Sequence, residues 1–364
     1  MKKIINILLA VILVVASCFT LIACDETGAG SKNKGLLLKK YDGEDFYTVY
    51  GYVDEGKGVT SLDIGEVAGE KTVGRISENA FLGNDTLVEI IVPNTVEEIS
   101  KGAFAKMKNL EKITLPFVGA NKNADAYLFE TDESEGKAVD FTRTFGHVFG
   151  TEEYPYGSLI EAGYGASSSS FYIPAYLEEV TIAPAGEYKI PMYAFSGVKL
   201  INKINLTGNV TAIGQSAFEG CRDLQQINIP STVKTIYKKA FKDCEFLSQL
   251  TFDQNSELLE IKDNAFDGAK LEQIVLPENV MVIGKYAFAR SGIKTITLSK
   301  NLTSVMPYAF FDCKYLTSVN VSLITGAPSL GASAFEDCIS LDWTTSLENV
   351  WGYKGNNYNN NVAK

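Results

Sequence analysis

The chain has 364 residues, of which 46% are hydrophobic and 21% are charged. A chain of this length and apolar content can bury a large ordered core, which excludes a protein that is disordered throughout. The formal net charge of −11 at pH 7 also excludes nucleic acid as an expected partner, because nucleic-acid affinity depends mainly on Lys and Arg that neutralise phosphates.

The first 23 residues have the pattern of a secretion signal. Two lysines precede an apolar run over residues 4–15, and the segment closes on Leu-Ile-Ala before Cys24. A second small-residue box ends at Cys18, but cleavage there would leave the apolar residues 19–23 at the new terminus. The segment resembles a bacterial lipoprotein signal peptide, which implies that Cys24 becomes the first mature residue and carries the lipid. A transmembrane anchor and a soluble secreted product are the alternatives.

Residues 24–35 follow as a run of Gly, Ser and charged residues without hydrophobic periodicity. Such a composition is typical of a flexible tether. Together with residues 1–23 as a signal peptide, it predicts a folded body that is lipid-anchored to a bacterial cell membrane and faces the extracellular side.

The rest of the chain repeats itself. The pair Ala-Phe occurs nine times, at intervals of 22 to 25 residues apart from one interval of 91. The sequence around each pair is close to the consensus I-x-x-x-A-F-x-x-C-x-x-L-x-x-I-x-L-P-x-x-V-x-x-I. A period of this length that carries L-x-x-I-x-L indicates a leucine-rich-repeat coil, in which each turn adds one short strand to a parallel stack. The phenylalanines of the nine pairs are Phe81, Phe104, Phe195, Phe218, Phe241, Phe266, Phe288, Phe310 and Phe335.

We therefore predict an α/β solenoid that consists mostly of short parallel strands, loops and turns. In the strand predicted over residues 224–229, Ile227 and Ile229 point to one side and Gln226 and Asn228 to the other, because side chains alternate along a strand. One repeat of this length buries too little apolar surface to offset the ordering of its own chain. Repeats are therefore stable only as an array with covered ends.

The sequence of the repeats resembles that of the BspA-type leucine-rich repeats of bacterial surface proteins. The stretches that carry the resemblance are ENAFLGNDTLVEIIVP, KGAFAKMKNLEKITLP, QSAFEGCRDLQQINIP and KYAFARSGIKTITLS, and the repeats extend over about residues 60–345. The resemblance implies a surface-exposed or secreted binding or adhesion protein, and some members of that family engage host extracellular-matrix proteins. It implies no particular binding residues.

The repeats divide the mature chain into segments. We expect residues 36–75 to contain an N-terminal cap, in which the aromatic-polar alternation of residues 41–53 predicts strand or hairpin, followed by a first degenerate repeat. The predicted segments after it are leucine-rich repeats at 76–116, an aromatic-rich island at 117–176, further repeats at 177–345 and a C-terminal tail at 346–364.

The island is the one long interruption. A fifth of its residues are aromatic, against 11% in the whole chain. Its aromatic side chains either pack as a local core against the flank of the coil or, with the acidic run over residues 130–135, form a recognition surface. The strand positions on either side, Ile113 and Val180, are 67 residues apart, close to three repeat lengths, so we expect the island to fill about three turns.

The outward side chains of the predicted strands form a long, mostly uncharged strip of hydrogen-bonding groups. This strip is the candidate binding surface, and an ordinary solvated sheet surface is the alternative. It lacks the Trp, Tyr and Arg that dominate protein-protein hot spots, which favours a weak, extended contact with a polysaccharide or a protein edge. The candidate binding residues are Gln226, Asn228, Gln249, Thr251, Gln273, Thr297 and Asn320.

Four cysteines occupy one repeat position, three residues after the Phe of their repeats. We predict free, buried thiols, because parallel side chains of stacked turns hold their Cβ atoms slightly too far apart for a disulfide. No C-x-x-C pair occurs, so a zinc site is unsupported. The four residues are Cys221, Cys244, Cys313 and Cys338.

Catalysis has little support in the sequence. The single histidine, His147, lies between aromatic residues without a nucleophile motif beside it, and no phosphate-binding, zinc-protease or calcium-loop motif occurs. We expect a protein with no enzymatic activity, no metal and no cofactor.

Our leading hypothesis is a monomeric cell-surface lipoprotein whose solenoid binds or adheres to a partner. The partner is an extracellular or host-matrix protein, or a cell-wall or host glycan. The alternative is a cell-envelope accessory or polysaccharide-binding protein, with or without weak hydrolase activity in the island.

Overall fold

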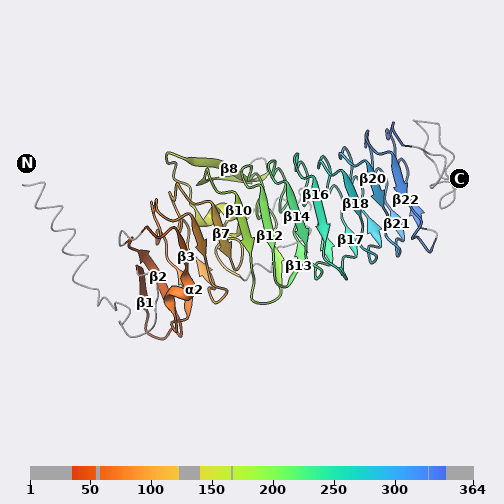
Figure 1. The fold of residues 1–364 in the computed structure, drawn as a ribbon. Coiled ribbons are helices and arrows are strands. Elements are labelled where there is room, and N and C mark those ends of the chain that lie inside the picture. Colours follow the sequence, from red (N-terminus) through yellow and green to blue (C-terminus); the bar gives the residue numbers. More distant parts are fainter. Residues whose placement is uncertain (1–34, 55–57, 123–139, 165–166, 327, 342–364) are drawn as a thin grey trace, which may run out of the picture.

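The computed structural model describes residues 35–54, 58–122, 140–164, 167–326 and 328–341. They form a parallel β-solenoid of about 11 turns, so the predicted leucine-rich-repeat coil is confirmed. Figure 1 shows an elongated rod in which the turns follow one another in chain order. Among the described residues, helix is limited to α2 (Ile64–Ala68) and two 3-10 turns, so the coil is almost entirely strand and turn.

One side of the coil carries the strands of the L-x-x-I-x-L segments. Seven of them form a continuous sheet in the order β16-β14-β12-β10-β7-β5-β3, and three more form a separate sheet, β18-β20-β22. Their inward residues, such as Ile227 and Ile274, are buried. The strands are β3 (Ser61–Asp63), β5 (Glu89–Ile91), β7 (Lys112–Leu115), β10 (Glu179–Ile182), β12 (Lys203–Leu206), β14 (Gln226–Ile229), β16 (Gln249–Phe252), β18 (Gln273–Val275), β20 (Thr295–Thr297) and β22 (Ser318–Asn320).

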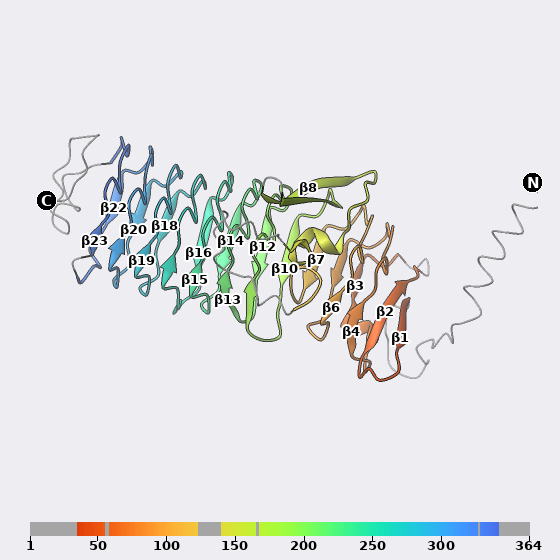
Figure 2. The ribbon, with the colours of Figure 1, turned by 180° about the vertical axis from the view of Figure 1, so that it is seen from behind.

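A second sheet lies on another side of the coil and contains the V-x-x-I segments. Its order is β11-β13-β15-β17-β19-β21-β23, and Figure 2 shows this side from behind. Most of these strands have only two residues, and the isoleucine that ends β15, β17 and β19 is fully buried in each case. The strands are β11 (Tyr188–Ile190), β13 (Val210–Ile213), β15 (Thr235–Ile236), β17 (Glu260–Ile261), β19 (Val282–Ile283), β21 (Ser304–Val305) and β23 (Ser329–Leu330).

The N-terminal end of the coil is a small sheet of its own. β1 (Leu36–Lys40) pairs antiparallel with β2 (Tyr47–Tyr52), so residues 41–53 contain a strand, as predicted, and it is the second strand of a hairpin that begins at Leu36. β2 pairs parallel with β4 (Val73–Ile76), and β4 pairs with β6 (Glu98–Ile99). The hairpin therefore covers the first edge of the parallel stack, which would otherwise expose unpaired backbone groups.

The Ala-Phe segments stack along the coil. In the regular part of the coil, the backbone N–H of each Phe donates to the carbonyl of the Ala in the next turn, as from Phe218 to Ala240 (2.8 Å) and from Phe241 to Ala265 (2.7 Å). The rings lie almost parallel. The angle between the Phe218 and Phe241 rings is 7°, with centroids 4.9 Å apart, and that between the Phe241 and Phe266 rings is 2°. All nine phenylalanines are buried, so this column is the centre of the core.

Two backbone positions flank the Ala-Phe pair in the left-handed region. One is two residues before the Phe and the other two residues after it. In the repeat of Phe288 they are Tyr286, with φ 55°, and Arg290, with φ 53°. Glycine serves at the second position in several repeats, for example Gly220 with φ 72°. Non-glycine residues at these sites carry a backbone cost, which the stacked turns offset by packing and hydrogen bonding.

The island does not fill three turns of the sheet, so that expectation is wrong. β7 and β10 pair directly, with Ile113 opposite Val180. On the phenylalanine side, two 3-10 turns, η3 (Phe141–Arg143) and η4 (Phe145–Val148), fill a single level. The N–H of Phe104 donates to the carbonyl of Val148 (2.9 Å), and that of Phe145 donates to the carbonyl of Ala194 (2.7 Å). Sequence distance overestimated the number of turns because part of the island leaves the coil.

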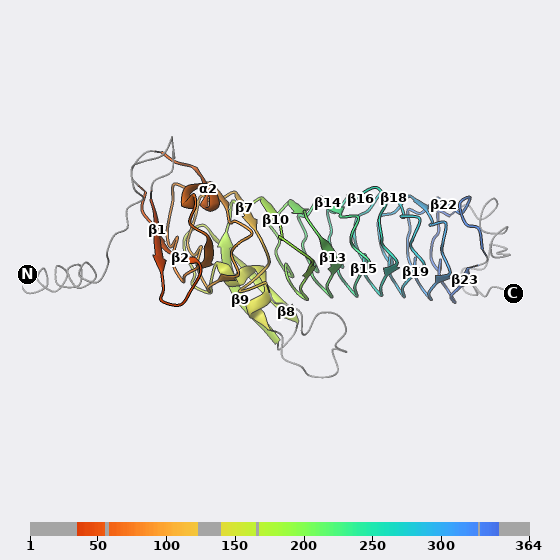
Figure 3. The ribbon, with the colours of Figure 1, turned by 90° about the horizontal axis from the view of Figure 1, so that it is seen from below.

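That part is an antiparallel hairpin of β8 (Gly157–Tyr164) and β9 (Ser167–Pro174). Figure 3 shows it projecting beside the coil near β10. Its inner side chains Ile160, Phe171 and Ile173 are buried, and Phe145 and Phe149 of the island join the core. The packing interpretation is therefore confirmed for these aromatic residues. The acidic run at 130–135 lies outside the described residues.

The four repeat cysteines are buried, as predicted, and carry free thiols. Each thiol donates to the carbonyl of the Phe in the preceding turn, over 3.1 Å from Cys221 to Phe195 and 3.2 Å from Cys244 to Phe218. The same bond joins the last two cysteines to Phe288 and Phe310. The thiols thus satisfy backbone carbonyls inside the core, where an unpaired polar group would destabilise the fold.

Candidate ligand-binding face

The outward side chains of β10, β12, β14, β16, β18, β20 and β22 form one surface, which we call the strand face. All seven predicted binding residues lie on it, and all are exposed except Thr297, which is half-buried. The register places Gln226 opposite Gln249 and Asn228 opposite Thr251. In the separate C-terminal sheet, Thr297 pairs with Asn320.

The predicted residues differ in how far their polar groups are already used. The Thr251 hydroxyl donates to Asn228 Oδ1 (2.8 Å), and Asn228 Nδ2 donates to Asp253 Oδ1 (2.7 Å). In contrast, the side-chain amides of Gln226, Gln249 and Gln273 form no hydrogen bond within the part of the chain that the structure describes. These three exposed amides occupy successive turns, β14, β16 and β18, so their donors and acceptors face the solvent together.

The strand face changes character towards its N-terminal end, where charged groups form a network. Glu179 lies between two lysines, with Lys203 Nζ 2.8 Å from Oε1 and Lys112 Nζ 3.7 Å from Oε2. Asn205 Nδ2 also donates to Glu179 Oε1 (2.7 Å). The hydrogen bond from Lys203 lowers the pKa of Glu179 most, against the opposing effect of burial. The network uses these groups internally, so the uncharged strip begins at β14.

A hollow interrupts the strand face between β16 and β18, which are not paired with each other. It has a volume of about 960 Å³, and three predicted residues, Thr251, Gln273 and Thr297, line it. Val275, 67% exposed, and Leu323, 48% exposed, contribute apolar surface to the same hollow. A ligand here would meet amide, hydroxyl and apolar groups together, the mixture that is typical of small-molecule sites.

Sequence reasoning missed three exposed aromatic residues at the rim of this face. Tyr176, Phe246 and Tyr315 are 52%, 52% and 64% exposed, and we call them the edge row. The signal was present in the sequence, because each residue directly precedes the leucine that anchors its strand. Only exposure in the folded chain separates these rings from the many aromatic residues of the core.

The chemistry that the structure offers near His147 is limited. Burial lowers the pKa of His147, and the positive charge of Lys101 lowers it further. Its backbone carbonyl accepts a hydrogen bond from the N–H of Gly102 (3.0 Å), so η4 forms part of one turn of the coil. Over the described ranges, no three His, Cys, Asp or Glu side chains are arranged to hold a metal ion.

The predicted lipidation residue, Cys24, lies outside the described residues, as does the tail at 346–364. In the portion of the chain that is described, no helix has both the length and the apolar character needed to cross a membrane.

Several solved structures are similar to this chain. A leucine-rich repeat protein from Bacteroides ovatus is 19% identical, with a TM-score of 0.38, and the match covers 85% of this chain and 80% of that one. A leucine-rich cell surface protein from Faecalibacterium prausnitzii is 20% identical, with a TM-score of 0.32 and coverage of 87% and 95%. The pneumococcal vaccine antigen PcpA is 18% identical, with a TM-score of 0.38 and coverage of 84% and 67%.

A search of curated proteins gave no match. The family model described as the BspA type leucine rich repeat region, in six copies, matches residues 60–141, 166–260 and 255–361, which is more than half of the sequence. The repeats, the parallel coil that they build and this match agree, and the chain belongs to the BspA-type leucine-rich repeat family.

Proposed function

We propose that this protein is a non-enzymatic cell-surface binding protein that holds an extracellular partner on the strand face. The partner is an extracellular or host-matrix protein, or a cell-wall or host glycan. Membership of a family of surface-type leucine-rich repeat proteins supports an interaction or adhesion role.

One observation carries the proposal. The amides of Gln226, Gln249 and Gln273 are exposed on three successive turns without a partner among the described side chains, and Gln273 also lines the hollow. Each amide offers a donor and an acceptor in a plane, and the parallel strands hold the three at a regular spacing. An extended ligand with repeating hydrogen-bonding groups would satisfy several of them at once.

The display of this face also needs an anchor. In our proposal, Cys24 carries a lipid after removal of residues 1–23, and residues 24–35 tether a monomeric coil outside the bacterial cell membrane. The proposal assigns no catalytic role to His147, which is half-buried and whose backbone carbonyl accepts a hydrogen bond from Gly102 within the coil. In this proposal the coil therefore serves to present the strand face to an extracellular partner.

The binding role can be tested with the full mature chain carrying Cys24→Ser, probed against an array of matrix proteins and purified glycans. We expect saturable binding to at least one class. The triple variant Gln226→Ala, Gln249→Ala, Gln273→Ala is expected to bind at least about tenfold more weakly, since each amide loses a contact worth about 1 kcal/mol.

The matched control carries Lys234→Ala and Thr303→Ala, exposed residues of the second sheet side, and should bind like the wild type. Binding by the triple variant that equals the control, or no binding to any member of the array, would contradict the proposal.

The anchor is tested separately by growing cells with a fatty-acid analogue. We expect label and membrane association for the wild type and loss of both for Cys24→Ser. Label that persists in the variant would show that Cys24 is not the lipidated residue.

A further inference from the structure

We propose that the edge row (Tyr176, Phe246 and Tyr315) binds an extended, neutral polysaccharide, whose hydroxyl groups bond to the adjacent amides of the strand face. This inference rests on the proposed function, since it takes the strand face to be the binding surface. It adds the three aromatic residues to the site and narrows the ligand to one chemical class.

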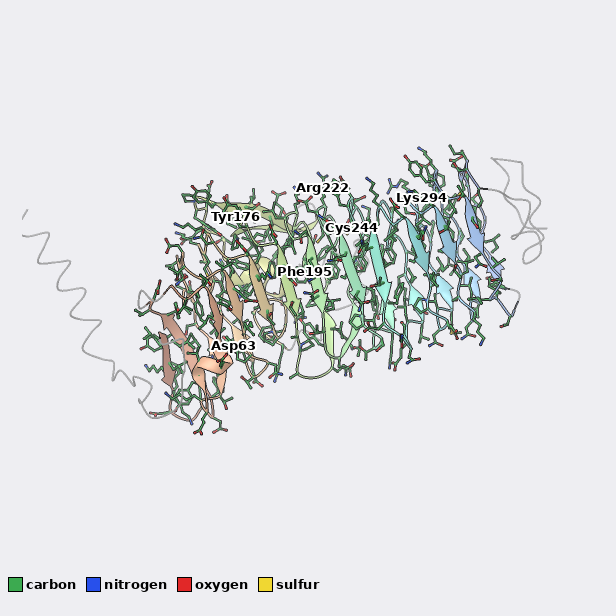
Figure 4. All side chains as sticks on the ribbon, in the orientation of Figure 1. Asp63, Tyr176, Phe195, Arg222, Cys244 and Lys294 are labelled. Atoms are coloured by element: carbon green, nitrogen blue, oxygen red, sulfur yellow. The ribbon has the colours of Figure 1, made fainter. Side chains whose placement is uncertain are left out.

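The three rings occupy equivalent places on one rim of the coil. Tyr176 precedes the first residue of β10 by three positions, Phe246 precedes that of β16 by three, and Tyr315 precedes that of β22 by three. The strands within each sheet are in register, so these positions fall on the same edge. Figure 4 shows Tyr176 on this upper edge, together with Arg222 and Lys294.

The spacing of the row is regular. Three turns separate β10 from β16, through β12 and β14, and three turns separate β16 from β22, through β18 and β20 (Figure 1). At a strand separation of about 4.8 Å within a paired sheet, the turns of Tyr176 and Phe246 are roughly 14 Å apart. β16 and β18 are not paired, but the Phe241 and Phe266 rings of those two turns lie 5.1 Å apart, so the turns continue at a similar step towards Tyr315. Single exposed apolar residues are ordinary, but a row that recurs at every third turn matches a linear ligand whose apolar faces recur along its length.

The rings are available for contact. Each is more than half exposed. Tyr176 is widened into a platform by Tyr156, 60% exposed, whose ring is stacked at 6.4 Å between centroids. The Nζ of Lys270 lies 5.8 Å from the centroid of the Phe246 ring. Because sugar rings present flat C–H faces, exposed aromatic rings of this kind suit stacking against them.

Two of the cations beside the rings, Arg222 and Lys294, are paired with carboxylates, while the ammonium of Lys270 lies over the Phe246 ring; this favours a neutral ligand. Arg222 Nε lies 3.1 Å from Glu245 Oε1, and Lys294 Nζ lies 3.2 Å from Glu272 Oε2. An anionic polymer would need cations that are free to pair with it. A protein partner is also disfavoured, because protein hot spots cluster their aromatic anchors at the centre of an interface, whereas these rings stand far apart.

The amides complete the match. Gln226, Gln249 and Gln273 lie on the strands that run from the same rim, between Tyr176 and Tyr315, and their side chains form no hydrogen bonds among the described residues. A polysaccharide laid along the rim would stack on the rings and place its hydroxyl groups against these amides. Contact at several rings raises the effective affinity for a long chain over that for a short oligosaccharide.

The test is affinity electrophoresis of the mature Cys24→Ser chain in gels that contain soluble polysaccharides. The neutral probes are a mixed-linkage β-glucan, an arabinoxylan, a galactomannan and glycogen, and the anionic probe is polygalacturonate. We expect retardation by at least one neutral probe. The dissociation constant should be at least about tenfold higher for a trisaccharide of the same linkage than for the polymer.

The triple variant Tyr176→Ala, Phe246→Ala, Tyr315→Ala should lose at least about tenfold in affinity for that polymer, and each single variant should lose less. The matched control is Tyr41→Ala, an exposed aromatic residue directly after β1, which should bind like the wild type. Circular dichroism and the unfolding midpoint should be unchanged in the triple variant, because its rings are exposed.

Each outcome is decisive. If the triple variant binds with an affinity within about twofold of that of the wild type, the edge row does not bind the polysaccharide. Binding to polygalacturonate alone, or to none of the polysaccharides, contradicts the proposal that the ligand is a neutral polysaccharide. If the wild type then still binds a matrix protein through the three glutamines, the proposed function stands without this inference, whereas failure of both arms removes both.

Discussion

The regular coil after residue 177 and the island at 117–176 keep the same core by different means. From Phe195 to Phe335 the stacked rings deviate from parallel by 7° or less. At the island, the ring of Phe149 is tilted by 50° against Phe104 and by 62° against Phe145. The backbone bonds nevertheless continue from Phe104 through Val148 and from Phe145 to Ala194.

The difference shows which features of a turn are interchangeable. Ring geometry varies freely, but every level of the column keeps a buried aromatic ring and a backbone bond to the next level. A solenoid depends on contacts between neighbouring turns, so an insertion is tolerated where it restores those contacts. If the island is as much a part of the core as the repeats are, substitutions of buried residues in the two regions should destabilise the fold to a similar extent.

Loss of a buried ring from the phenylalanine column should destabilise the fold most. Phe241→Ala in the regular coil and Phe149→Ala in the island should each reduce the free energy of unfolding by about 3–5 kcal/mol, because both side chains are buried. Urea unfolding followed by circular dichroism measures both. Phe246→Ala, which removes an exposed ring, is the control and should change stability by less than about 0.5 kcal/mol. A negligible cost for Phe149→Ala would mean that the island merely covers the coil.

The next effect separates backbone strain from docking of the hairpin. Gly220 and Gly197 occupy the same repeat position with φ of 72° and 73°. A Cβ at Gly220 meets nothing closer than 3.9 Å, whereas one at Gly197 would lie 2.3 Å from the carbonyl oxygen of Glu161 in β8. Gly220→Ala should cost about 1–2 kcal/mol from strain alone, and Gly197→Ala clearly more, because it must also displace β8. Equal costs in thermal or urea unfolding would show that the hairpin is not held against the coil.

The four repeat cysteines belong to the regular coil, and they predict alkaline sensitivity. Burial raises the pKa of the Cys221 and Cys244 thiols, so the folded chain keeps them protonated where the unfolded chain ionises. Their contribution is fully present below the unfolded thiol pKa of about 8.5 and is lost as the pH rises above it. Unfolding free energy should therefore fall between about pH 8 and 9.5, and the fall should be shallower in Cys221→Ala, Cys244→Ala. Identical slopes would contradict buried protonated thiols.

The smallest effect is expected from His147 in the island, on the free energy of unfolding at acidic pH. Burial depresses the pKa of His147. As the pH falls, the unfolded chain therefore binds a proton at this residue at a higher pH than the folded chain does. The contribution of a neutral His147 is present above the unfolded pKa of about 6.5 and is lost as the pH falls below it. The stability of the wild type relative to His147→Asn should decline from pH 7 to pH 5. A pH-independent difference between the two proteins would refute this, and the alkaline slope serves as the internal control.

The candidate site divides between what sequence reasoning reached and what it missed. The alternation of Ile227 and Asn228 along a strand placed the seven predicted residues on one face, because a period of two fixes which side chains point outward. The same reasoning could not tell that Asn228 and Thr251 bond to each other while Gln226 and Gln249 stay unpaired. That distinction depends on side-chain rotamers and on Asp253, which lies beyond the strand.

The coil, its period, the phenylalanine column and the core position of the cysteines could all be predicted from the sequence. These follow from local spacing, since each turn packs against a near copy of itself. The position of the island became clear from the folded chain alone, because it depends on contacts between distant segments, such as Phe171 over Gly146 and Glu161 beside Gly197. The folded chain also shows which aromatic rings stay exposed: Phe241 and Phe246 are five residues apart in one repeat, yet one is buried in the column and the other stands at the rim.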